Sequence, residues 1–566
     1  MDGSTAISDF QNRVNKLVSE SLSGYNPQKY AKEKSIRDAV WGTCRFYPWE
    51  VAVLDSPLLQ RLRDIRQTGL AFLVYPTAVH TRFDHTLGVV TVASRIVRSI
   101  NDKHPQKKDP IISYADHMRI RFSALLHDVG HSCLSHVSEA IFGNTKEFQA
   151  LQVEINDQFG VTPKPHEIMS WLIVQSQRFK EFVDELVEKR LLVDWDCAPE
   201  DIDKIAGNII GYRKNPSEKF HADIINGPMD ADKLDYLMRD AYFAGPTVVY
   251  DLDRFLHTVD AIEYPRDEIL VGHGAKIVRL SIPIEGVTAL EQIIISKLML
   301  FSYLYHHQKI RCVEGMYHVA LERRVALSST THKKLDSLKF DHPVCFLSLS
   351  DRSLLPDAWP PEIAGDKVTG EIINMLVRRR LYKRALVISR IFIPNIDTDM
   401  QVKNGFNRLL TCATNSEDRD ILTKWIFDLA YKKMASKSCK NETKELRKMF
   451  KIHHILIDIP KSPTIEEAEG VMIPMSSKMN SPDKKYVPLS DMFPIEKWVD
   501  AYNAIKWRGH IFTLEDAAPF VNIAAIEVLA KEPFHLSFTN QASDLCKITR
   551  PNFDMLPIFA GREVTH

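Results

Sequence analysis

Residues 127–136 read His-Asp-Val-Gly-His-Ser-Cys-Leu-Ser-His and directly follow the apolar run Ser-Ala-Leu-Leu of residues 123–126. Polar side chains next to such a core-forming run are costly to bury unless something binds them. Imidazole and carboxylate are common ligands of divalent metals. A lone histidine on an apolar face is usually only hydrogen-bonded, but an adjacent His-Asp pair followed by two more histidines favours a metal site. This stretch therefore predicts a metal-binding motif at the end of a core helix.

Composition indicates an ordinary globular protein. The chain has 566 residues, 45% of them hydrophobic and 26% charged, so we expect one large core and an accessory lobe. Basic and acidic residues balance at 73 each. Bulk charge therefore gives no reason to expect nucleic acid or an anionic membrane as the main partner.

Cysteine spacing and apolar runs favour a soluble cytoplasmic protein. The eight cysteines are scattered without a CxxC pair, as is typical of reduced thiols rather than a disulfide framework or a zinc ribbon. The first sixteen residues are polar and do not resemble a signal peptide. The longest apolar candidate, residues 293–305, is interrupted by Lys297 and is shorter than the roughly 18 residues that a membrane span needs.

Apolar periodicity predicts a fold of the mainly α class, with an all-helical core and a smaller mixed α/β C-terminal lobe. Four regions are expected: an N-terminal arm (1–34, mobile or a short helix), the core (35–330), a helical extension (331–452) and the C-terminal lobe (453–566). In the core we expect a hairpin at 35–48 and helices at 57–67, 89–100, 114–126, 165–178 and 288–321. Further along, we expect helices at 369–390, 416–450, 498–506 and 513–530, a strand at 454–459 and a long loop at 462–489.

Four candidate metal ligands stand at separate places in the chain: His85, the pair His127 and Asp128, and Asp232. Two imidazoles and two carboxylates suit a divalent ion with open positions for water and substrate oxygens, and such an ion also activates water. The donor set admits iron, manganese, magnesium, nickel or zinc.

Charged and acid–base residues accompany these ligands. Arg82 and Lys233 would place cations where a phosphate would lie. Acid–base candidates are His131, His136, Glu139 and His166, because a histidine held by a carboxylate can protonate a leaving oxygen. His127 and His131 share a face if the helix continues past residue 127, whereas Gly130 makes a break equally consistent with the sequence.

Competing motifs are absent or incomplete. The sequence has no GxxxxGK[ST] phosphate loop and no GxGxxG fingerprint, which argues against a P-loop or Rossmann nucleotide enzyme. His166-Glu167 opens like the HExxH motif of zinc proteases, but Ser170 stands at the fifth position. The basic runs at 378–384 and 432–451 are interpreted as solvated helix faces rather than a nucleic-acid surface.

Five ordered blocks give the sequence a family resemblance. They are SPLLQRLRDIRQTG (56–69), HTRFDHTLG (80–88), LLHDVGHSCLSH (125–136), DADKLDYLMRDA (230–241) and YLYHHQ (303–308). Together they resemble the HD-domain phosphohydrolases, and more closely the deoxynucleoside triphosphate triphosphohydrolases of the SAM-and-HD-domain type. The resemblance runs from about Ile36 to Met316, and no SAM domain precedes it. It implies hydrolysis of a deoxynucleoside triphosphate (dNTP) to deoxynucleoside and inorganic triphosphate.

The resemblance also implies roles for individual residues. The implied metal ligands are His85, His127, Asp128 and Asp232. The implied phosphate contacts are Arg82 and Lys233, with Lys297 where the family uses an arginine. His131, His166 and Glu139 (an aspartate in the family) match the catalytic residues, and His136 would be a nearby active-site histidine. Gln67 and Thr68 match the pair against the deoxyribose, Tyr236, Asp240 and Tyr305 match residues that hold the sugar, and His306 stands where a glutamine often contacts the base.

The family further implies nucleotide activation and assembly. Asp55, Arg61 and Arg63 match residues that bind an activating nucleotide at a subunit interface, so a homo-oligomer, dimer or tetramer, is expected, with additional magnesium on nucleotide phosphates. The sequence departs from the family pattern at Ser132-Cys133, where Gly-Pro is usual, and at Thr68, where leucine is usual.

Two alternatives share the metal motif. One is another HD-type phosphohydrolase that acts on nucleoside monophosphates, cyclic nucleotides or alarmones. The other is a nucleotide-sensing regulator with little catalysis, although a pure sensor has no need of the acid–base residues. Fold-level analogy alone does not separate these functions.

Overall fold

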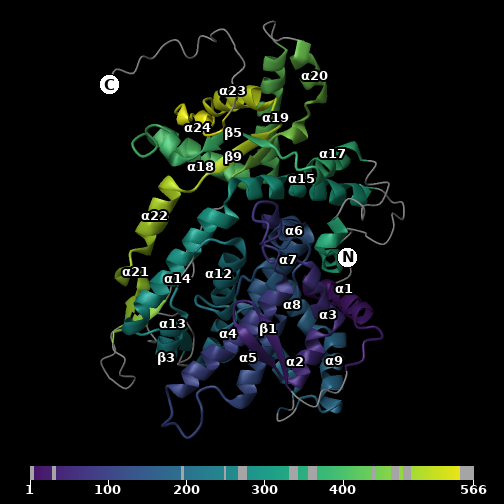
Figure 1. Cartoon of the computed structure of the whole chain (residues 1–566), viewed down its shortest axis with the longest axis vertical. Helices are drawn as coiled ribbons and strands as arrows, with labels where there is room; N and C mark the ends of the chain where they lie inside the picture. The colour runs from purple at the N-terminus through teal and green to yellow at the C-terminus, as the bar shows by residue number, and fades with distance from the viewer. Residues whose placement is uncertain are drawn as a thin grey trace. The chain divides into compact units, whose positions relative to one another are not determined.

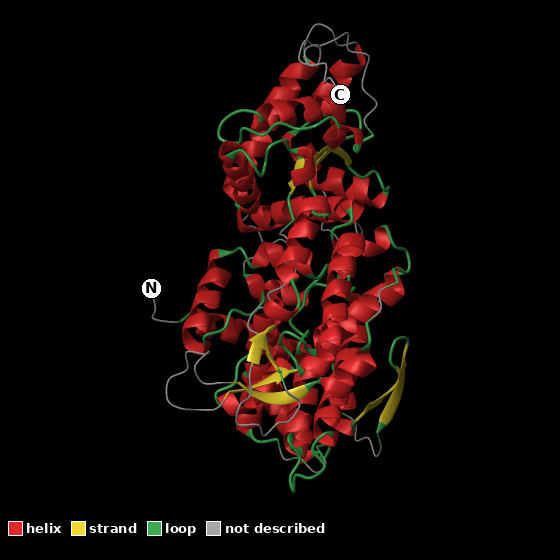
Figure 2. Cartoon of the chain, turned by 90° about the vertical axis from the view of Figure 1, so that its left-hand side faces the viewer, coloured by secondary structure: helices red, strands yellow, loops and turns green. Residues whose placement is uncertain are grey.

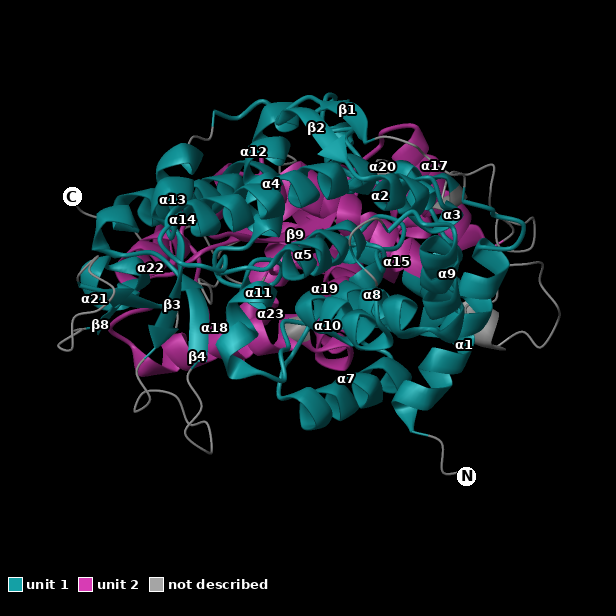
Figure 3. Cartoon of the chain, turned by 90° about the horizontal axis from the view of Figure 1, so that it is seen from below, with its two compact units in different colours: residues 1–304, 322–365, 464–496 teal, residues 305–321, 366–463, 497–566 magenta. Residues whose placement is uncertain are grey.

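The computed structural model describes residues 5–27, 33–192, 195, 197–247, 250–264, 277–330, 342–354, 366–435, 441–460, 471–475 and 486–547. Most of these residues are helical, and the strands form only small sheets (Figure 2). The mainly α class is therefore confirmed. The chain forms two compact units, coloured separately in Figure 3. Unit 1 contains Met1–Leu304, Glu322–Gly365 and Thr464–Glu496, and unit 2 contains Tyr305–Leu321, Asp366–Pro463 and Lys497–His566.

The N-terminal segment is a packed helix followed by a hairpin. Helix α1 (Ala6–Ser21) buries Phe10, Val14 and Val18, whose spacing of four places them on one helix face. Of the two alternatives for this arm, the helical one holds and the mobile one is wrong for residues 6–21. Strands β1 (Lys34–Asp38) and β2 (Gly42–Phe46) pair antiparallel, as expected for the hairpin.

Three helices of unit 1 carry the predicted ligands: α4 (Arg82–Asp102), α5 (Tyr114–Leu126) and α12 (Ala231–Ala244) (Figure 1). Each begins at a side chain that accepts a backbone N–H of its first turn: Thr81, Ser113 and Asp230 respectively. Such caps fix where a helix begins. Helix α4 packs against both α5 and α12, so the three helices meet around one core.

The rest of unit 1 surrounds this core. Its other helices are α2 (Pro48–Leu54), α3 (Pro57–Gln60), α6 (His136–Phe142), α7 (Lys146–Phe159), α8 (Pro165–Gln175), α9 (Gln177–Glu188), α10 (Pro199–Ile209), α11 (Lys219–Asp223), α13 (Leu252–Thr258), α14 (Val287–Leu300) and α21 (Leu489–Met492). Its other strands pair antiparallel, β3 (Asp260–Tyr264) with β4 (Ile277–Ser281) and β7 (Met472–Pro474) with β8 (Tyr486–Pro488).

The helix expected at 288–321 is interrupted. Helix α14 ends at Leu300, a π-helical turn covers Phe301–Tyr305, and α15 (Gln308–Thr330) follows. The run contains no proline and no glycine near this break, so the local sequence does not mark it.

An apolar stretch in the same region is longer than we expected. Residues Ile284–Tyr305 are long and apolar enough to cross a membrane by length and composition, with a mean hydropathy of 1.4. The expectation that no run reaches this length is therefore wrong. Half of the stretch is buried inside the fold, and α14 packs against α12 and α13. The buried core helix of a globular unit has the same character.

Unit 2 is built on a three-stranded antiparallel sheet in the order β5-β9-β6. The strands are β5 (Lys383–Ile388), β6 (Leu456–Asp458) and the fully buried β9 (Gly509–Thr513). The helices are α17 (Lys367–Val377), α18 (Met400–Thr414), α19 (Ser416–Met434), α20 (Asn441–Met449), α23 (Ala518–Leu529) and α24 (Gln541–Asp544), while α22 (Ile495–Ile505) begins in unit 1. Helix α23 packs against both β5 and α19.

Several C-terminal predictions need correction. The helix expected at 369–390 ends at Val377, and residues 383–388 form strand β5, because a short apolar run has no decisive period. The helix expected at 416–450 is divided into α19 and α20, and the one at 513–530 begins at Ala518. The strand expected at 454–459 is confirmed as β6. In the loop expected at 462–489, residues 472–474 and 486–488 pair as strands, and most of the remainder lies outside the described residues.

Candidate metal centre and active site

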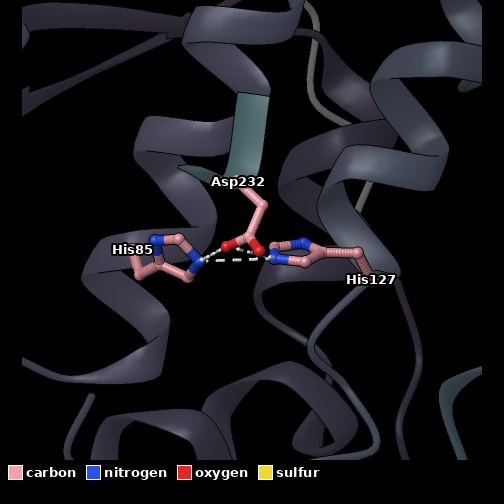
Figure 4. A group of neighbouring side chains, drawn as sticks. All are labelled: His85, His127 and Asp232. Carbon is pink, nitrogen blue, oxygen red and sulfur yellow. Dashed lines mark hydrogen bonds and ion pairs between the residues drawn. The ribbon is translucent and has the colours of Figure 1, made fainter. Parts of the chain in front are cut away.

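Three of the predicted ligands converge at one point in unit 1 (Figure 4). His85 lies in the first turn of α4, His127 caps the C-terminus of α5, and Asp232 lies in the first turn of α12. The Nε2 atoms of the two histidines are 3.3 Å apart. Oδ1 of Asp232 lies 2.9 Å from Nε2 of His85 and 3.9 Å from Nε2 of His127. Helix packing therefore joins residues that are far apart in the sequence.

Asp128 adjoins this group. Its Oδ1 atom lies 3.4 Å from Nε2 of His127, and its Oδ2 atom lies 3.7 Å from Nε2 of His85. Arg82 donates from Nη1 to Oδ2 of Asp128 over 2.8 Å. The structure thus brings all four predicted ligands together, with one predicted phosphate contact bonded to them.

The Nδ1 atoms of His85 and His127 point away from the centre, and their hydrogen-bond acceptors fix where these rings carry a proton. Nδ1 of His85 lies 2.7 Å from a carboxylate oxygen of Asp235, and Nδ1 of His127 lies 2.7 Å from the carbonyl oxygen of Ala124. These oxygens can only accept, so each Nδ1 carries a proton and each Nε2 faces the centre, where it binds either a proton or a metal ion. Two ring nitrogens at this separation need a proton or a metal ion between them, and nitrogens bound to one metal at ~2.1 Å lie about 3.0–3.4 Å apart. The donor set therefore fits a divalent metal ion.

The charges around the centre also favour a cation. Burial opposes a charge on His85, but Asp232 and Asp235 outweigh it and raise the pKa of His85 to about 10. Burial works against ionised carboxylates as well, yet His85 holds the pKa of Asp232 below its usual range. Arg82 and His127 do the same for the pKa of Asp128. The centre therefore stabilises positive charge between ionised carboxylates.

A buried network holds His85 from behind. Asp235 accepts from Nε and Nη2 of Arg239 over 2.8 and 2.9 Å and from the indole N–H of Trp41. Arg239 donates from Nη1 to Asp38 over 2.9 Å. The β1–β2 hairpin thus supplies two residues to the support of a ligand. Asp235 and Arg239 are four residues apart on α12 and so share a helix face, but no sequence motif predicted that they support His85.

Gly88 allows α4 and α12 to approach each other at this network. A Cβ atom at residue 88 would lie 1.8 Å from Oδ1 of Asp235 and 2.4 Å from Nη2 of Arg239. Any other residue would displace one of these side chains. The glycine of the HTRFDHTLG block therefore has a packing role.

Three histidines surround Glu139. Its Oε1 atom lies 2.8 Å from Nδ1 of His131 and 3.0 Å from Nδ1 of His166, and its Oε2 atom lies 3.1 Å from Nδ1 of His136. The rings of His131 and His166 stack with centroids 3.9 Å apart. Nε2 of His131 also lies 3.3 Å from Oδ1 of Asp128. The predicted acid–base residues therefore form one cluster that touches the metal centre.

The two stacked histidines differ in protonation. Burial lowers the pKa of His131 to about 4, together with the positive charges of Arg82 and His166. Burial also opposes a proton on His166, but Glu139 outweighs it and raises the pKa of His166 above its usual value. His166 is thus the more basic histidine of the pair. His136 is 69% exposed at its side chain, so it lies at the edge of the cluster.

The motif loop leaves the helix before Gly130. Helix α5 ends at Leu126, so His127 and His131 do not share a helix face. A Cβ at Gly130 would lie 2.2 Å from the carbonyl oxygen of His166, which explains the glycine at this close approach. Ser170 accepts from Gly130 N–H over 2.8 Å and donates to the carbonyl oxygen of His127 over 2.6 Å. The serine of the incomplete HExxH pattern therefore holds the loop.

Further along, the loop is strained. Leu134 and Ser135 have φ values of 54° and 49°, a region that costs a non-glycine residue about 1–3 kcal/mol. Ser135 accepts from Nε of Arg82 over 3.1 Å and donates to the carbonyl oxygen of Arg66 over 2.9 Å. Asp351 accepts from the backbone N–H groups of Leu134 and Arg66 over 2.7 and 3.0 Å. No sequence motif pointed to Asp351.

The predicted sugar-binding residues lie next to Arg82. Within the described part of the chain, Oε1 of Gln67 and Oγ1 of Thr68 are buried without a hydrogen-bond partner. Nη2 of Arg82 lies 3.5 Å from the carbonyl oxygen of Gln67. The backbone N–H of Gln67 donates to the carbonyl oxygen of His80, whose Nε2 lies 2.8 Å from Oδ1 of Asp240. Buried polar atoms without partners are rare and mark places where a ligand can bind.

Other predicted contacts are engaged elsewhere or lie in unit 2. The ammonium group of Lys233 binds Asp230 over 2.7 Å and the carbonyl oxygen of Gly227 over 2.9 Å. Tyr236 is half-buried on α12, and Lys297 lies in the last turn of α14. Tyr305 and His306 belong to unit 2, where Nδ1 of His306 lies 3.5 Å from Oη of Tyr502.

The three residues matched to an activating-nucleotide site face different surroundings. Arg61 donates to the carbonyl oxygen of Val129, and burial lowers its pKa to about 10. Arg63 is exposed, donates to Gln60 over 2.9 Å and lies over the ring of Phe83. Asp55 is exposed at the C-terminal cap of α2. Arg61 and Arg63 therefore do not share one exposed face.

Lys164 is a cation that the sequence reasoning missed. Its side chain is 59% exposed, and its ammonium group lies 3.6 Å from Oε1 of Glu167. Partial desolvation of the ammonium group opposes its charge, but the carboxylates of Glu167 and Asp232 outweigh this effect and raise the pKa of Lys164. Its position two residues before His166 is the only signal that the sequence offered.

A second histidine cluster lies in unit 2. Nε2 of His454 lies 3.0 Å from Oε1 of Glu371, and Nε2 of His453 lies 3.3 Å from Oε2 of the same residue. The backbone N–H of Lys451 donates to Nδ1 of His454 over 3.1 Å, so the proton of His454 is on Nε2. That nitrogen has no lone pair for a metal, and the cluster is a hydrogen-bonded connection between α17 and residues 451–454.

Comparisons with known proteins agree with the motifs. Residues 82–206 match the HD domain, and residues 275–422 match the HD associated region. The chain is 33% identical over 233 residues to the deoxynucleoside triphosphate triphosphohydrolase SAMHD1 of Bos taurus, which covers 39% of this chain and 38% of that protein. It is 26% identical over 381 residues to the SAMHD1 homolog of Dictyostelium discoideum, which covers 65% and 64%. The family resemblance drawn from the five blocks is therefore confirmed.

Two further relatives are uncharacterised. A protein of Methanocaldococcus jannaschii is 29% identical over 323 residues, which cover 57% of this chain and 56% of that protein. The matched regions thus span less than two thirds of the length of these curated relatives. The crystal structure of a hypothetical protein from Aquifex aeolicus superposes with a TM-score of 0.55 at 21% identity, over 87% of this chain and all of that one. The two share a fold.

Proposed function

We propose that this HD-domain protein is a metal-dependent phosphohydrolase that converts a deoxynucleoside triphosphate to deoxynucleoside and inorganic triphosphate. One observation carries the proposal: the four-ligand centre is bonded through Arg82 to a place where Gln67 and Thr68 present buried polar atoms without partners within the described residues. The first feature fits phosphate chemistry and the second fits recognition of a sugar. The similarity to SAMHD1 proteins supports the same substrate class.

Two groups of residues would act on the phosphate: the candidate metal ligands and Arg82. His85, His127, Asp128 and Asp232 would hold a divalent ion, which when bound supplies Lewis-acid chemistry at the phosphate and lowers the pKa of water. Arg82 is fixed by Asp128 and Ser135 and adds a permanent positive charge beside the reacting phosphate. Such preorganised charges stabilise the charge that develops in the transition state.

His166 is the proton donor in the proposed reaction. Water attacks the α-phosphorus and loses one proton to solvent, the bond between that phosphorus and the 5′-oxygen breaks, and its electron pair goes to the 5′-oxygen. His166 then gives its proton to that oxygen, because Glu139 keeps this imidazole protonated. His131, with its lowered pKa, stays neutral between His166 and Asp128. Inorganic triphosphate and deoxynucleoside are the products.

In this proposal, residues near Arg82 bind the sugar of the substrate. Gln67 and Thr68 offer two acceptor oxygens, and His80 holds Asp240 by a 2.8 Å contact. A substrate hydroxyl that pairs with these groups removes the cost of leaving them unsatisfied.

The test is product analysis. Purified protein is incubated with each dNTP and each candidate metal, with and without a second nucleotide, and products are separated by anion-exchange chromatography. Deoxynucleoside and intact triphosphate are expected, and Asp232→Asn should abolish the reaction while Asp102→Asn, at the exposed end of α4, should not. Stepwise release of single phosphates, or no turnover of any dNTP, contradicts the proposal.

One observation favours a second substrate class. The hydroxyl of Thr68 is buried without a partner among the described residues, and it can bond a 2′-hydroxyl group. A ribonucleotide substrate of the same hydrolysis is therefore the second candidate. Parallel assays with ribonucleoside triphosphates separate the two.

A further inference from the structure

We propose that Asp351 is a positioning residue for the active site, which holds the strained motif loop and through it the guanidinium of Arg82. The effect that we expect on kcat rests on the proposed function, whereas the structural role of Asp351 does not. Asp351 lies in a short 3₁₀ turn, Asp351–Leu354, more than two hundred residues after the motif loop that it contacts. It touches neither the metal ligands nor the place of the substrate, so it acts through other residues.

The carboxylate of Asp351 joins two segments of the site. Its Oδ1 accepts from the backbone N–H of Leu134 over 2.7 Å, and its Oδ2 accepts from the backbone N–H of Arg66 over 3.0 Å. Nη1 of Arg66 lies 3.5 Å from the same Oδ2. Asp351 is 8% exposed, so these groups depend on one another rather than on water. One side chain thus ties the motif loop to the segment before Gln67.

The loop needs such an external hold. Leu134 and Ser135 both have positive φ, a conformation that persists only when the surroundings over-determine it. The bond from Leu134 N–H to Asp351 fixes the first of these two residues. Ser135 is then placed so that its hydroxyl group donates to the carbonyl oxygen of Arg66, on the other segment that Asp351 binds.

The position of Ser135 in turn determines the position of Arg82. Its Nε donates to Oγ of Ser135 over 3.1 Å while its Nη1 donates to Asp128 over 2.8 Å. The two bonds together fix the plane of the guanidinium beside the metal centre. Losing the first leaves Arg82 held by Asp128 and by the longer contact of 3.5 Å to the carbonyl oxygen of Gln67, so the guanidinium is less firmly fixed. The chain of contacts therefore runs from Asp351 through Ser135 to the residue that faces the phosphate.

The neighbouring segment is arranged to present Asp351. Ser132 donates its hydroxyl hydrogen to the carbonyl oxygen of Phe346, and the ring of Phe346 packs on Phe142. Arg352 pairs with Asp64 over 2.8 Å. Residues 346–352 are therefore attached to the motif loop and to the segment around residue 64, on both sides of Asp351.

A carboxylate suits this position for a specific reason. Two backbone N–H groups need two acceptor oxygens, and a carboxylate supplies both, whereas an amide supplies one oxygen and one donor. Asp351→Asn therefore breaks one of the two bonds at nearly constant volume. Asp201→Asn is the matched control: Asp201 is also a buried carboxylate of unit 1, and it accepts from Ala198 N–H over 2.9 Å and from Arg119 over 2.6 Å, at the far end of α5 from His127.

The experiment compares both variants with the parent in full-length, metal-loaded protein. For Asp351→Asn we expect kcat to fall about 10- to 100-fold, the range typical when a supporting residue of a site is removed, with metal content unchanged. Asp201→Asn should lower the melting temperature comparably but leave kcat within twofold. Ser135→Ala should reproduce the loss, and the double variant Asp351→Asn/Ser135→Ala should lose no more than either single variant, because both act through one chain of contacts.

Hydrogen exchange supplies a readout that needs no activity. Peptides covering residues 132–135 should exchange faster in Asp351→Asn than in the parent or in Asp201→Asn. Unchanged exchange there, or a kcat loss shared equally by Asp201→Asn, overturns the inference. A parent protein that turns over no dNTP contradicts the proposed function instead, and the exchange measurement still decides whether Asp351 holds the loop.

Discussion

Nδ1 of His85 lies 2.7 Å from Oδ2 of Asp235, and both side chains are fully buried. This contact places a proton on Nδ1 of the candidate ligand histidine, because a carboxylate can only accept, and so turns Nε2 toward the centre. Asp235 in turn is held by Arg239, which together with His85 lowers the pKa of Asp235 to about 2 against the effect of burial. Asp235 therefore stays ionised behind the metal ligand.

The first prediction concerns this support. Asp235→Asn should weaken metal binding about 10- to 100-fold, because the amide accepts with only one oxygen and leaves Arg239 underpaired. Metal content after dialysis and titration calorimetry measure the effect. Asp223→Asn is the matched control, since Asp223 is a buried carboxylate of unit 1 that pairs with Arg279 over 2.7 Å away from the ligands. Equal metal affinity in the two variants would refute the role of Asp235.

The second prediction concerns the close approach at Gly88. The Gly88→Ala variant should lose metal and melt at a lower temperature, because its Cβ would overlap Oδ1 of Asp235 and Nη2 of Arg239. Overpacking of this kind costs about 1–3 kcal/mol. Thermal melts with and without metal measure both effects. A variant with parental melting temperature and full metal content would show that the two helices can separate freely.

The third prediction is a pH dependence. The pKa of His166 is raised by Glu139, so the proton donor stays charged to higher pH than an ordinary histidine, and kcat should fall only as pH rises above that raised pKa. Glu139→Gln removes the main cause and should move the alkaline limb to lower pH. Glu167→Gln, whose carboxylate lies 4.0 Å from Nε2 of His166, should move it less. An alkaline limb that is unaffected by Glu139→Gln would assign the proton donor elsewhere.

The fourth prediction concerns Lys164. Its exposed ammonium group lies beside the carboxylates of the site and can reach the phosphates of a bound nucleotide. Lys164→Met should raise KM about two- to fivefold with little change in kcat, since an exposed charge pair is weak, and the difference should shrink at high salt. Lys146→Met, an exposed lysine at the start of α7, is the control. An unchanged KM would show that Lys164 does not contact the substrate.

Local rules explain which parts of the fold were predictable. Helix α5 runs from Tyr114 to Leu126 as expected, because its cap and apolar spacing are read from neighbouring residues. The sequence wrongly predicted a helix where strand β5 forms. The four-residue apolar run 385–388 has no decisive period, and its strand partner β9 lies over a hundred residues away. The break after Leu300 has no local marker either.

The candidate site was also predictable only in part from the sequence. The four ligand side chains were identified from the sequence because ligand chemistry depends on residue type, and the structure brings all four together. Asp351 and Lys164 were missed because each acts on residues that are distant in the sequence. Asp351 binds the backbone of Leu134, and Lys164 interacts with the charge of Asp232. The support of His85 by Asp235 was missed as well, because only the packing of α12 on α4 brings the two side chains together.

The sequence by itself determined the helices around the centre, the four candidate ligand residues and the family resemblance. These follow from local periodicity, helix caps and side-chain chemistry. Only the tertiary structure decided which nitrogen of each histidine faces the centre, which of His131 and His166 holds the proton, and which residue holds the strained loop. Each of these depends on a hydrogen bond or a buried charge supplied by a distant segment, and such contacts exist only once the helices have packed.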